Sequence, residues 1–271
     1  MFHLDPLYTA VGWVLVHWHF ALTALGLPYD SGVTWTLSIG LLVITVRLLL
    51  FRFFLGQLRH QRTMSALQPR LAAIRRKHGT DRTAPQREML ALQRAEGFNP
   101  VAGCLPTLLQ IPIFLALVHL LRHVAGSVSR AASDPHNALY GLTSRQTLSA
   151  AHARLFGAPL AASLHDGTAR IHVLLGTVTG THVVVGLVVV ISAAATYCTQ
   201  RLIKSANPIP LEGTAATVQR VMRYAAPLSV LGSALFFPLG VLLYWCTSNL
   251  WTLGQQGYVE RFHPHPAPQR P

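Results

Sequence analysis

The stretch LLVITVRLLLF, residues 41–51, places one arginine in the middle of an otherwise apolar run. Residues 35–54 together have the length that a helix needs to cross a bilayer, about 20 residues. Arg47 lies near the centre of this run, where a charge costs ~2.5–3.5 kcal/mol on insertion scales. The segment therefore predicts a transmembrane helix with a charge that must be used or neutralised.

The composition is that of an integral membrane protein. The 271 residues are 51% hydrophobic and 11% charged, whereas about a quarter of the residues of a soluble domain are charged. The net charge of +13 could indicate nucleic acid as a partner. However, the basic residues cluster beside apolar segments, which favours membrane topology and an anionic partner near the surface. We expect no direct sequence-specific binding of nucleic acid.

The sequence carries no recognisable catalytic or metal-binding motif. Its nine acidic residues form no paired carboxylates, and HExxH, Walker A, GxGxxG and GxSxG patterns are missing. The 14 histidines are scattered, and all three cysteines fall in apolar segments, as small buried side chains do. We therefore expect a protein that is not an enzyme and has no cofactor or metal.

Apolar segments and charged loops predict an all-α polytopic protein with five transmembrane helices. The spans after the first are residues 101–123, 183–200, 221–237 and 239–255. Residues 55–99 hold nine basic side chains, whereas the longer loop 126–180 holds four. By the positive-inside rule the first loop is cytoplasmic and the second is outside. This places the protein in the plasma membrane, with its N-terminus outside and its C-terminus in the cytoplasm.

The cytoplasmic segment, residues 58–98, reads as a basic helical hairpin. Met64, Leu67, Leu71 and Ile74 repeat at helical spacing, and a break around Gly79 separates them from a second helix. The alternative is a solvated loop that only obeys the positive-inside bias. The candidate contact residues of the hairpin are Arg59, Arg62, Arg70, Arg75, Arg76 and Lys77.

The expected domain organisation has three parts. Residues 1–30, which include Trp13 and Trp18, predict a helix at the outer interface, and a sixth span is the alternative. Residues 31–257 form the five-span core around a polar groove, with the hairpin 58–98 and an outer loop 126–180 of unassigned role. Residues 258–271 form a short cytoplasmic tail.

An arginine at membrane depth usually pairs with a carboxylate on a neighbouring helix. Here no Asp or Glu occurs in residues 31–80, 97–133, 167–211 or 213–259, which contain every expected span. Arg47 is therefore either hydrated in a polar cavity or paired with a group from another molecule.

Polar stripes on the other spans favour such a cavity, because in lipid these groups turn toward one another or toward water. Ordinary hydrogen bonding between helices explains each stripe alone, but the combination with an unpaired arginine favours a groove. The stripes are Thr107 and Gln110 in the second span, Ser192, Thr196 and Gln200 in the third, and Trp245, Ser248, Asn249, Thr252, Gln255 and Gln256 in the last.

Four stretches of the chain carry a family resemblance. They are VRLLLFRFF (46–54), MSALQPRLAAIRRKHGTD (64–81), GFNPVAGCLPTLLQIPIFLAL (97–117) and FFPLGVLLYWCTSNLWTLGQQ (236–256). Together they resemble the YidC membrane protein insertases in the family's order, over about residues 35–125 and 183–257. FGAPL (156–160) resembles the actinobacterial branch, and the short region before Arg47 resembles the family's short form.

The resemblance implies a protein that inserts and helps to fold newly made membrane proteins, alone or with the Sec translocon, without nucleotide or metal. It implies that Arg47 is the groove arginine and that Gln200 and Trp245 are a polar and an aromatic groove position. It also implies that the hairpin receives nascent membrane proteins and contacts the ribosome or the Sec translocon beside the lipid bilayer. The tail has only Arg261 and Arg270, which argues against a ribosome grip through a basic tail.

Two other classes of function stay open at this point. An ion channel or small-solute transporter would also line a path with polar stripes, but it needs openings on both sides, and we find no convincing internal repeat. An assembly scaffold would use the arginine only as a structural residue.

Overall fold

A computed structural model describes residues 5–78, 84–96, 100–126, 140–206 and 213–262. These residues are predominantly helical, so the helical fold class is confirmed. The elements are α1 (Asp5–Ala24), α2 (Gly32–Leu49), α3 (Phe51–His78), α4 (Ala84–Ala95), α5 (Pro100–Gly126), α7 (Ser144–His152), β1 (Arg154–Leu155), β2 (Ala158–Pro159), α8 (Thr168–Val173), α9 (Val178–Ala206), α10 (Gly213–Ser233) and α11 (Leu239–Phe262).

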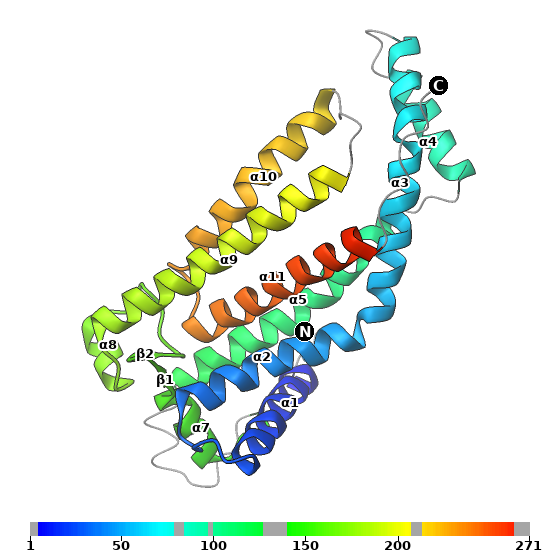
Figure 1. Cartoon of the computed structure of the whole chain (residues 1–271). Helices are drawn as coiled ribbons and strands as arrows, with labels where there is room; N and C mark the ends of the chain where they lie inside the picture. The colour runs from blue at the N-terminus through cyan, green and yellow to red at the C-terminus, as the bar shows by residue number, and fades with distance from the viewer. Residues whose placement is uncertain (1–4, 79–83, 97–99, 127–139, 207–212, 263–271) are drawn as a thin grey trace.

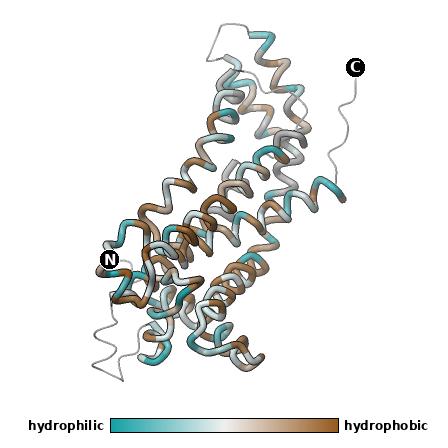
Figure 2. Tube along the Cα trace, turned by 60° about the vertical axis from the view of Figure 1, so that its left-hand side comes forward, coloured by the Kyte–Doolittle hydropathy of each residue, from teal (hydrophilic) through white to brown (hydrophobic). Residues whose placement is uncertain are grey.

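The long helices form one bundle (Figure 1). α11 packs against both α9 and α2, α10 packs on α9, and α1 packs on α2 and α5. α3 and α4 project from one end of the bundle, while α7, α8 and the β1–β2 pair gather at the other. Figure 2 shows hydrophobic residues along the bundle and hydrophilic residues toward its two ends.

One apolar core drawn from α2, α5, α9 and α11 holds the bundle together. Trp35, Ile39, Leu117, Val185 and Leu242 are among its almost fully buried side chains. Because lipid tails are as apolar as these side chains, close packing between helices is what stabilises such a core in a membrane.

Two of the described helices are long and apolar enough to cross a membrane. They are Gly32–Leu49 and Val178–Ile203, while Leu108–Val124 is a shorter apolar helix. These coincide with the first, third and second expected spans. α10 and α11 include Arg220, Arg223 and the polar stripe, which lower their mean hydropathy. The count of five spans is therefore a proposal.

The first expected span differs from the observed helix at its inner end. α2 stops at Leu49, and α3 begins at Phe51 in a new direction (Figure 1). Hydropathy does not register this break, because the side chains around Leu50 are apolar on both sides. Conversely, α9 and α11 extend beyond the expected spans, because helical hydrogen bonding continues where apolar composition ends. α10 is shifted relative to its expected span, 221–237, since it begins at Gly213 and ends at Ser233.

The expected outer loop is a packed structure at one end of the bundle, which we call the 140–177 cap. The backbone N–H groups of Leu239 and Gly240, in the first turn of α11, donate to Ala162 O and Leu160 O, both at 2.8 Å. A Cβ on Gly32 would lie 1.9 Å from Arg154 O, so the cap approaches α2 closely enough to require glycine there. The cap thus holds the ends of α2 and α11 together.

The N-terminal segment is a helix, α1, whose inner face packs on α2. Trp18 Nε1 donates to Thr45 Oγ1 at 2.9 Å, and the buried His19 donates to Tyr29 O at 2.9 Å. Trp13 and Phe20 are exposed on the opposite side. Length and composition do not place α1 among the described helices able to cross a membrane.

Candidate functional site

The site is built around Arg47, which reaches from the last turn of α2 to α11. Its Nη2 donates to Ser248 Oγ at 2.5 Å, to Thr252 Oγ1 at 3.2 Å and to Ser248 O at 3.4 Å. Ser248 and Thr252 are one helical turn apart, so both hydroxyls face α2. The structure therefore brings together three of the residues predicted for the groove.

The charge of Arg47 is hydrogen-bonded but not neutralised. In the part of the chain that the structure describes, no carboxylate oxygen lies within 4.0 Å of the guanidinium. Its Nε is buried and has no hydrogen-bond partner. An unsatisfied buried donor costs about 1–3 kcal/mol, and more when the group is charged. Arg47 therefore has both a free donor and an uncompensated charge.

Further polar contacts tie α9 and α5 to α11. Asn249 Nδ2 donates to Ser192 Oγ at 2.7 Å, and Gln110 on α5 donates to the Tyr244 hydroxyl. Thr196 is hydrogen-bonded within its own helix, to Ser192 O at 2.9 Å. α11 therefore carries polar contacts to three neighbouring helices.

The remaining predicted groove residues have different surroundings. Trp245 is half-buried and stacks on Phe114, with ring centroids 5.0 Å apart, and it meets Phe237 edge-on at 5.3 Å. Gln200 is half-buried on α9 without a side-chain hydrogen bond among the described residues. Thr107 lies in α5, but its side chain is outside the described set.

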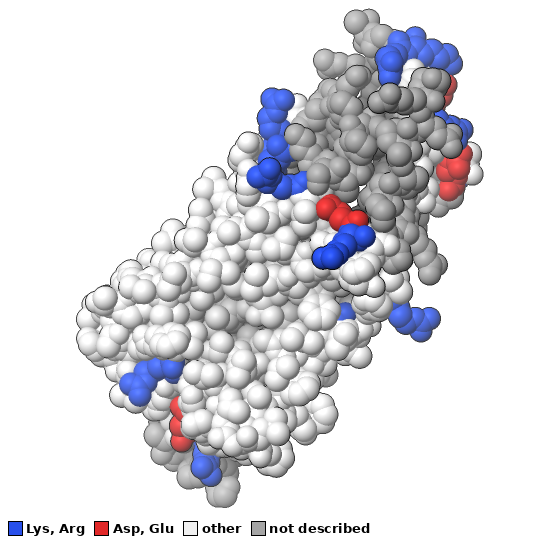
Figure 3. Space-filling view, viewed as in Figure 1, with Lys and Arg blue, Asp and Glu red and all other residues white. Residues whose placement is uncertain are grey.

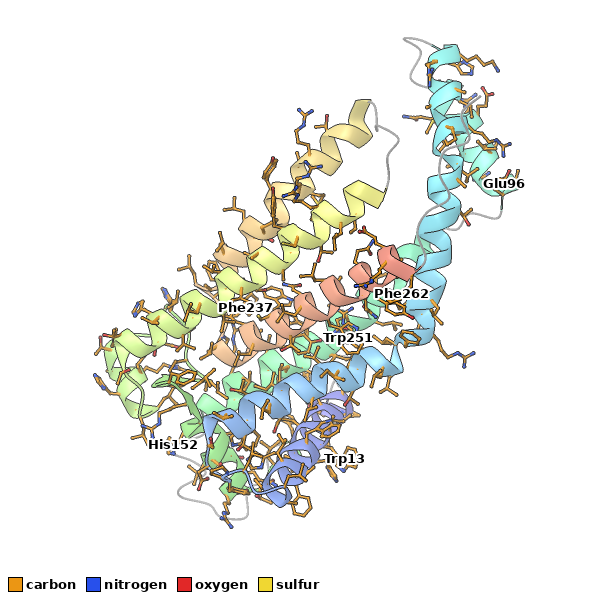
Figure 4. The ribbon with its side chains drawn as sticks, viewed as in Figure 1. Trp13, Glu96, His152, Phe237, Trp251 and Phe262 are labelled. Carbon is orange, nitrogen blue, oxygen red and sulfur yellow. The ribbon has the colours of Figure 1, made fainter. Side chains whose placement is uncertain are left out.

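Sequence reasoning missed three polar groups on α11. Tyr244 lies four residues before Ser248 on the same face, and this helical spacing was the signal. Trp251, labelled in Figure 4, has a buried Nε1 without a hydrogen-bond partner. The buried Oε1 of Glu260 has no hydrogen-bond partner either. Glu260 is on the helix because α11 runs on to Phe262, but it lies eight residues beyond Thr252, about 12 Å along the axis. It therefore does not neutralise Arg47.

α3 packs on α4 and on α5, and ion pairs join α3 to α4 and to Glu96 directly after it. Leu67 and Leu71 are buried, which fits the helical spacing noted in the sequence. Arg70 pairs with Glu96 at 2.5 Å, and Lys77 pairs with Glu88 at 3.2 Å. Arg76 is exposed, while Arg59, Arg62 and Arg75 lie in α3 with side chains outside the described set.

Glu88 is the electrostatic centre of this pair of helices. It accepts hydrogen bonds from His78 Nε2 at 2.5 Å and from Lys77 Nζ at 3.2 Å. These bonds favour the charged carboxylate and hold the pKa of Glu88 below its ordinary value.

Charges gather at the two ends of the molecule. Figure 3 shows Lys and Arg on the projecting α3–α4 end and near the adjacent ends of the other helices, with a second small group at the cap. On the face shown, the described surface between the two ends is almost free of charge. This is the distribution that a membrane-embedded body requires.

Comparison with known proteins places the chain in a family. Residues 27–266 match the model of the family described as 60Kd inner membrane protein. The relatives include three proteins named membrane protein insertase YidC. The one from Mycobacterium tuberculosis strain H37Rv is 35% identical over 269 residues, which cover 95% of this chain and 73% of that protein.

The other two relatives agree. The Streptomyces avermitilis protein is 34% identical over 261 residues, and the Tropheryma whipplei strain Twist protein is 32% identical over 274 residues. The matches cover 94% and 97% of this chain, and 58% and 85% of the two relatives. These names confirm the predicted resemblance and support the predicted insertase function. The chain belongs to the 60Kd inner membrane protein family, alongside the YidC membrane protein insertases.

Proposed function

We propose that this chain inserts newly made proteins into the plasma membrane through a polar groove in which Arg47 supplies the fixed positive charge. The observation that carries the proposal is that Arg47 donates, among the described residues, only to uncharged oxygens of Ser248 and Thr252, with Nε left without a partner. Such a guanidinium is positioned by the protein and still able to attract an anionic segment of a substrate.

The expected strength of that attraction suits transient binding. A carboxylate about 4 Å from Arg47 gains ~4 kcal/mol at an effective dielectric constant of 20. This is similar to the ~2.5–3.5 kcal/mol that a charge costs at the centre of a spanning helix. The acidic flank of a substrate would therefore be drawn into the groove without being trapped there.

The proposed topology has five spans, with the N-terminus outside and the hairpin and C-terminus in the cytoplasm. The nearly charge-free surface between the ends supports it, as does the basic α3–α4 end (Figure 3). At the cap end, Leu142, Leu160 and Leu239 are fully or almost fully buried. This packing supports a groove that opens toward the cytoplasm alone and disfavours a channel open on both sides.

The proposed partners are nascent membrane proteins, the lipid bilayer, the ribosome and the Sec translocon. The exposed Arg76 and Lys77 on α3 supply basic contacts for the ribosome or the translocon. α1 would lie along the outer interface, because it exposes Trp13 and Phe20 on the side away from α2. Moving a segment across the membrane in this way makes and breaks no covalent bond.

The proposal is tested with the purified chain in liposomes. The substrates are a single-span protein whose translocated tail carries two aspartates and a matched protein with two asparagines. We expect Arg47→Ala to slow insertion of the acidic substrate ~10-fold or more, equivalent to ~1.4 kcal/mol, and to affect the neutral one little. Arg47→Lys should retain most of the activity, because it keeps the charge.

The control variant is Arg170→Ala, which removes a distant arginine in the cap. Equal insertion of the acidic substrate by Arg47→Ala and by this control would contradict the proposed mechanism. Ion flux through the purified protein, in the absence of substrate, would instead favour the channel.

A further inference from the structure

The cap presents an apolar turn to its surroundings. Phe156 lies in the turn between β1 and β2 and is 83% exposed. Leu175 and Val173, just before α9, are also exposed. An exposed large apolar group of this kind usually marks an interaction surface.

The backbone holds these side chains outward at a cost. Phe156 and Leu175 have positive φ angles, 50° and 59°. A residue other than glycine in this region costs about 1–2 kcal/mol. Two hydrogen bonds link the turns: Arg154 Nη1 donates to Leu175 O at 2.7 Å, and Thr177 N donates to Gly157 O at 2.9 Å. The exposure of Phe156 and Leu175 is therefore built into the cap.

The turn adjoins the exposed face of α9. A Cβ on Gly180 would lie 2.9 Å from Phe156 O, so the backbone of the turn rests on Gly180. Val183 and Leu187 follow Gly180 at three and seven residues and thus share its face, and both are more than half exposed. Phe156 therefore lies at the outer end of an apolar stripe on a helix able to cross a membrane.

The length of α9 indicates how deep in the membrane the β1–β2 turn lies. Val178–Ile203 has 26 residues, about 39 Å at 1.5 Å per residue, whereas the hydrocarbon core is about 30 Å thick. The first turn of α9 therefore lies at the boundary between headgroups and acyl chains, where aromatic side chains are enriched. Arg170, which pairs with Asp166 at 3.1 Å, and His172 are both exposed on the preceding helix, α8.

We propose that Phe156, Val173 and Leu175 form a lipid anchor that inserts the cap into the outer leaflet of the membrane. The partner is the headgroup–acyl boundary of the bilayer, because the anchor continues the apolar face of α9. The anchor fixes the cap, and with it the capped ends of α2 and α11, at a defined depth. This inference rests on the proposed topology, in which the cap lies on the outer side, and not on the insertase activity.

The test measures the depth of a spin label at position 156. Phe156→Cys is made in a full chain whose cysteines at 104, 198 and 246 are replaced, and the labelled protein is placed in phosphatidylcholine and phosphatidylglycerol liposomes. Leu187→Cys serves as the reference on the exposed face of α9. His165→Cys, exposed on the same cap beside Asp166, serves as the matched control.

We expect collisions with oxygen to exceed collisions with a nickel chelate at positions 156 and 187, and the reverse at 165. A label at 156 that the nickel chelate reaches as readily as at 165 would overturn the anchor. A label shielded from both reagents would also overturn it, because it would indicate a protein surface in place of lipid. Each labelled variant is first checked for an unchanged melting temperature, so that only folded protein is compared.

Discussion

At Arg47, two hydroxyl groups accept the hydrogen bonds that a carboxylate accepts at most intramembrane arginines. A carboxylate would cancel the charge, whereas the dipoles of Ser248 and Thr252 hold the guanidinium in place and leave its charge intact. The two hydroxyls therefore fix the position of the charge, and because no carboxylate of the described residues lies beside it, the charge stays available to a substrate.

Removing the hydroxyls should weaken function without removing the charge. We expect the Ser248→Ala, Thr252→Val double variant to slow insertion of an acidic substrate ~10-fold, since a hydrogen bond to a charged group contributes ~1.5–3 kcal/mol. Thr247→Val is the matched control, because among the described residues the Thr247 hydroxyl bonds only within its own helix, to Leu243 O at 2.9 Å. Insertion rates in liposomes that are the same for both variants would contradict this role.

Much of this site could be predicted from the sequence. The lack of acidic residues in the expected spans and the hydroxyls four residues apart were sufficient to predict that Arg47, Ser248 and Thr252 belong to one site. However, the sequence predicts that the polar residues of α11 share one face of the helix, whereas in the structure they contact different neighbouring helices. Asn249 turns to Ser192 on α9 because successive residues point about 100° apart on a helix. Which neighbour each face meets depends on tertiary packing, which spacing does not encode.

At the scale of elements, the α3–α4 pair is held partly by a carboxylate that titrates. The pKa of Glu88 is lower in the folded hairpin than its ordinary value, 4.5, because His78 and Lys77 bond to the charged form. Such a group stabilises the folded form above its ordinary pKa, and this stabilisation is lost as the pH falls through the lowered value. We therefore expect the two helices to loosen as the pH falls below about 4.5.

Spin labels at Arg76 and Arg87 can follow this opening. The distance distribution between them should be narrow at pH 7 and broaden below about pH 4.5. In Glu88→Gln it should already be broad at pH 7. Glu96→Gln, which removes the Arg70 pair, is the control and should keep the acid-induced broadening. A Glu88→Gln variant with the wild-type distribution at pH 7 would refute the contribution of this carboxylate.

The helices themselves were better predicted than their ends. The presence of α2, α5, α9, α10 and α11 was predicted from runs of apolar residues. The break at Leu50 was not, because one residue with altered backbone angles between apolar neighbours changes neither composition nor spacing. The sequence predicts a loop where the structure has the cap, for a similar reason. Its short elements depend on contacts with α2 and α11, which local sequence does not show.

The charge distribution over the molecule supports the proposed orientation, in which the α3–α4 end faces the cytoplasm. We expect a cysteine at His165, in the cap, to react with a membrane-impermeant maleimide added to intact cells. A cysteine at Lys77, in the projecting α3, should react only after the membrane is permeabilised. Both positions are exposed, so a difference in labelling reports topology and not burial. The reverse pattern would invert the proposed orientation.

In the proposed function, the sign of the charge at position 47 selects the segment that the protein moves. The most direct measurement compares insertion of matched substrates with aspartate or lysine tails by the wild type and by Arg47→Glu, with Arg47→Gln as the uncharged control. We expect the wild type to prefer the aspartate tail, Arg47→Gln to show little preference, and Arg47→Glu to prefer the lysine tail. An Arg47→Glu variant that folds with an unchanged melting temperature and still prefers the aspartate tail would show that the charge at position 47 does not select the segment.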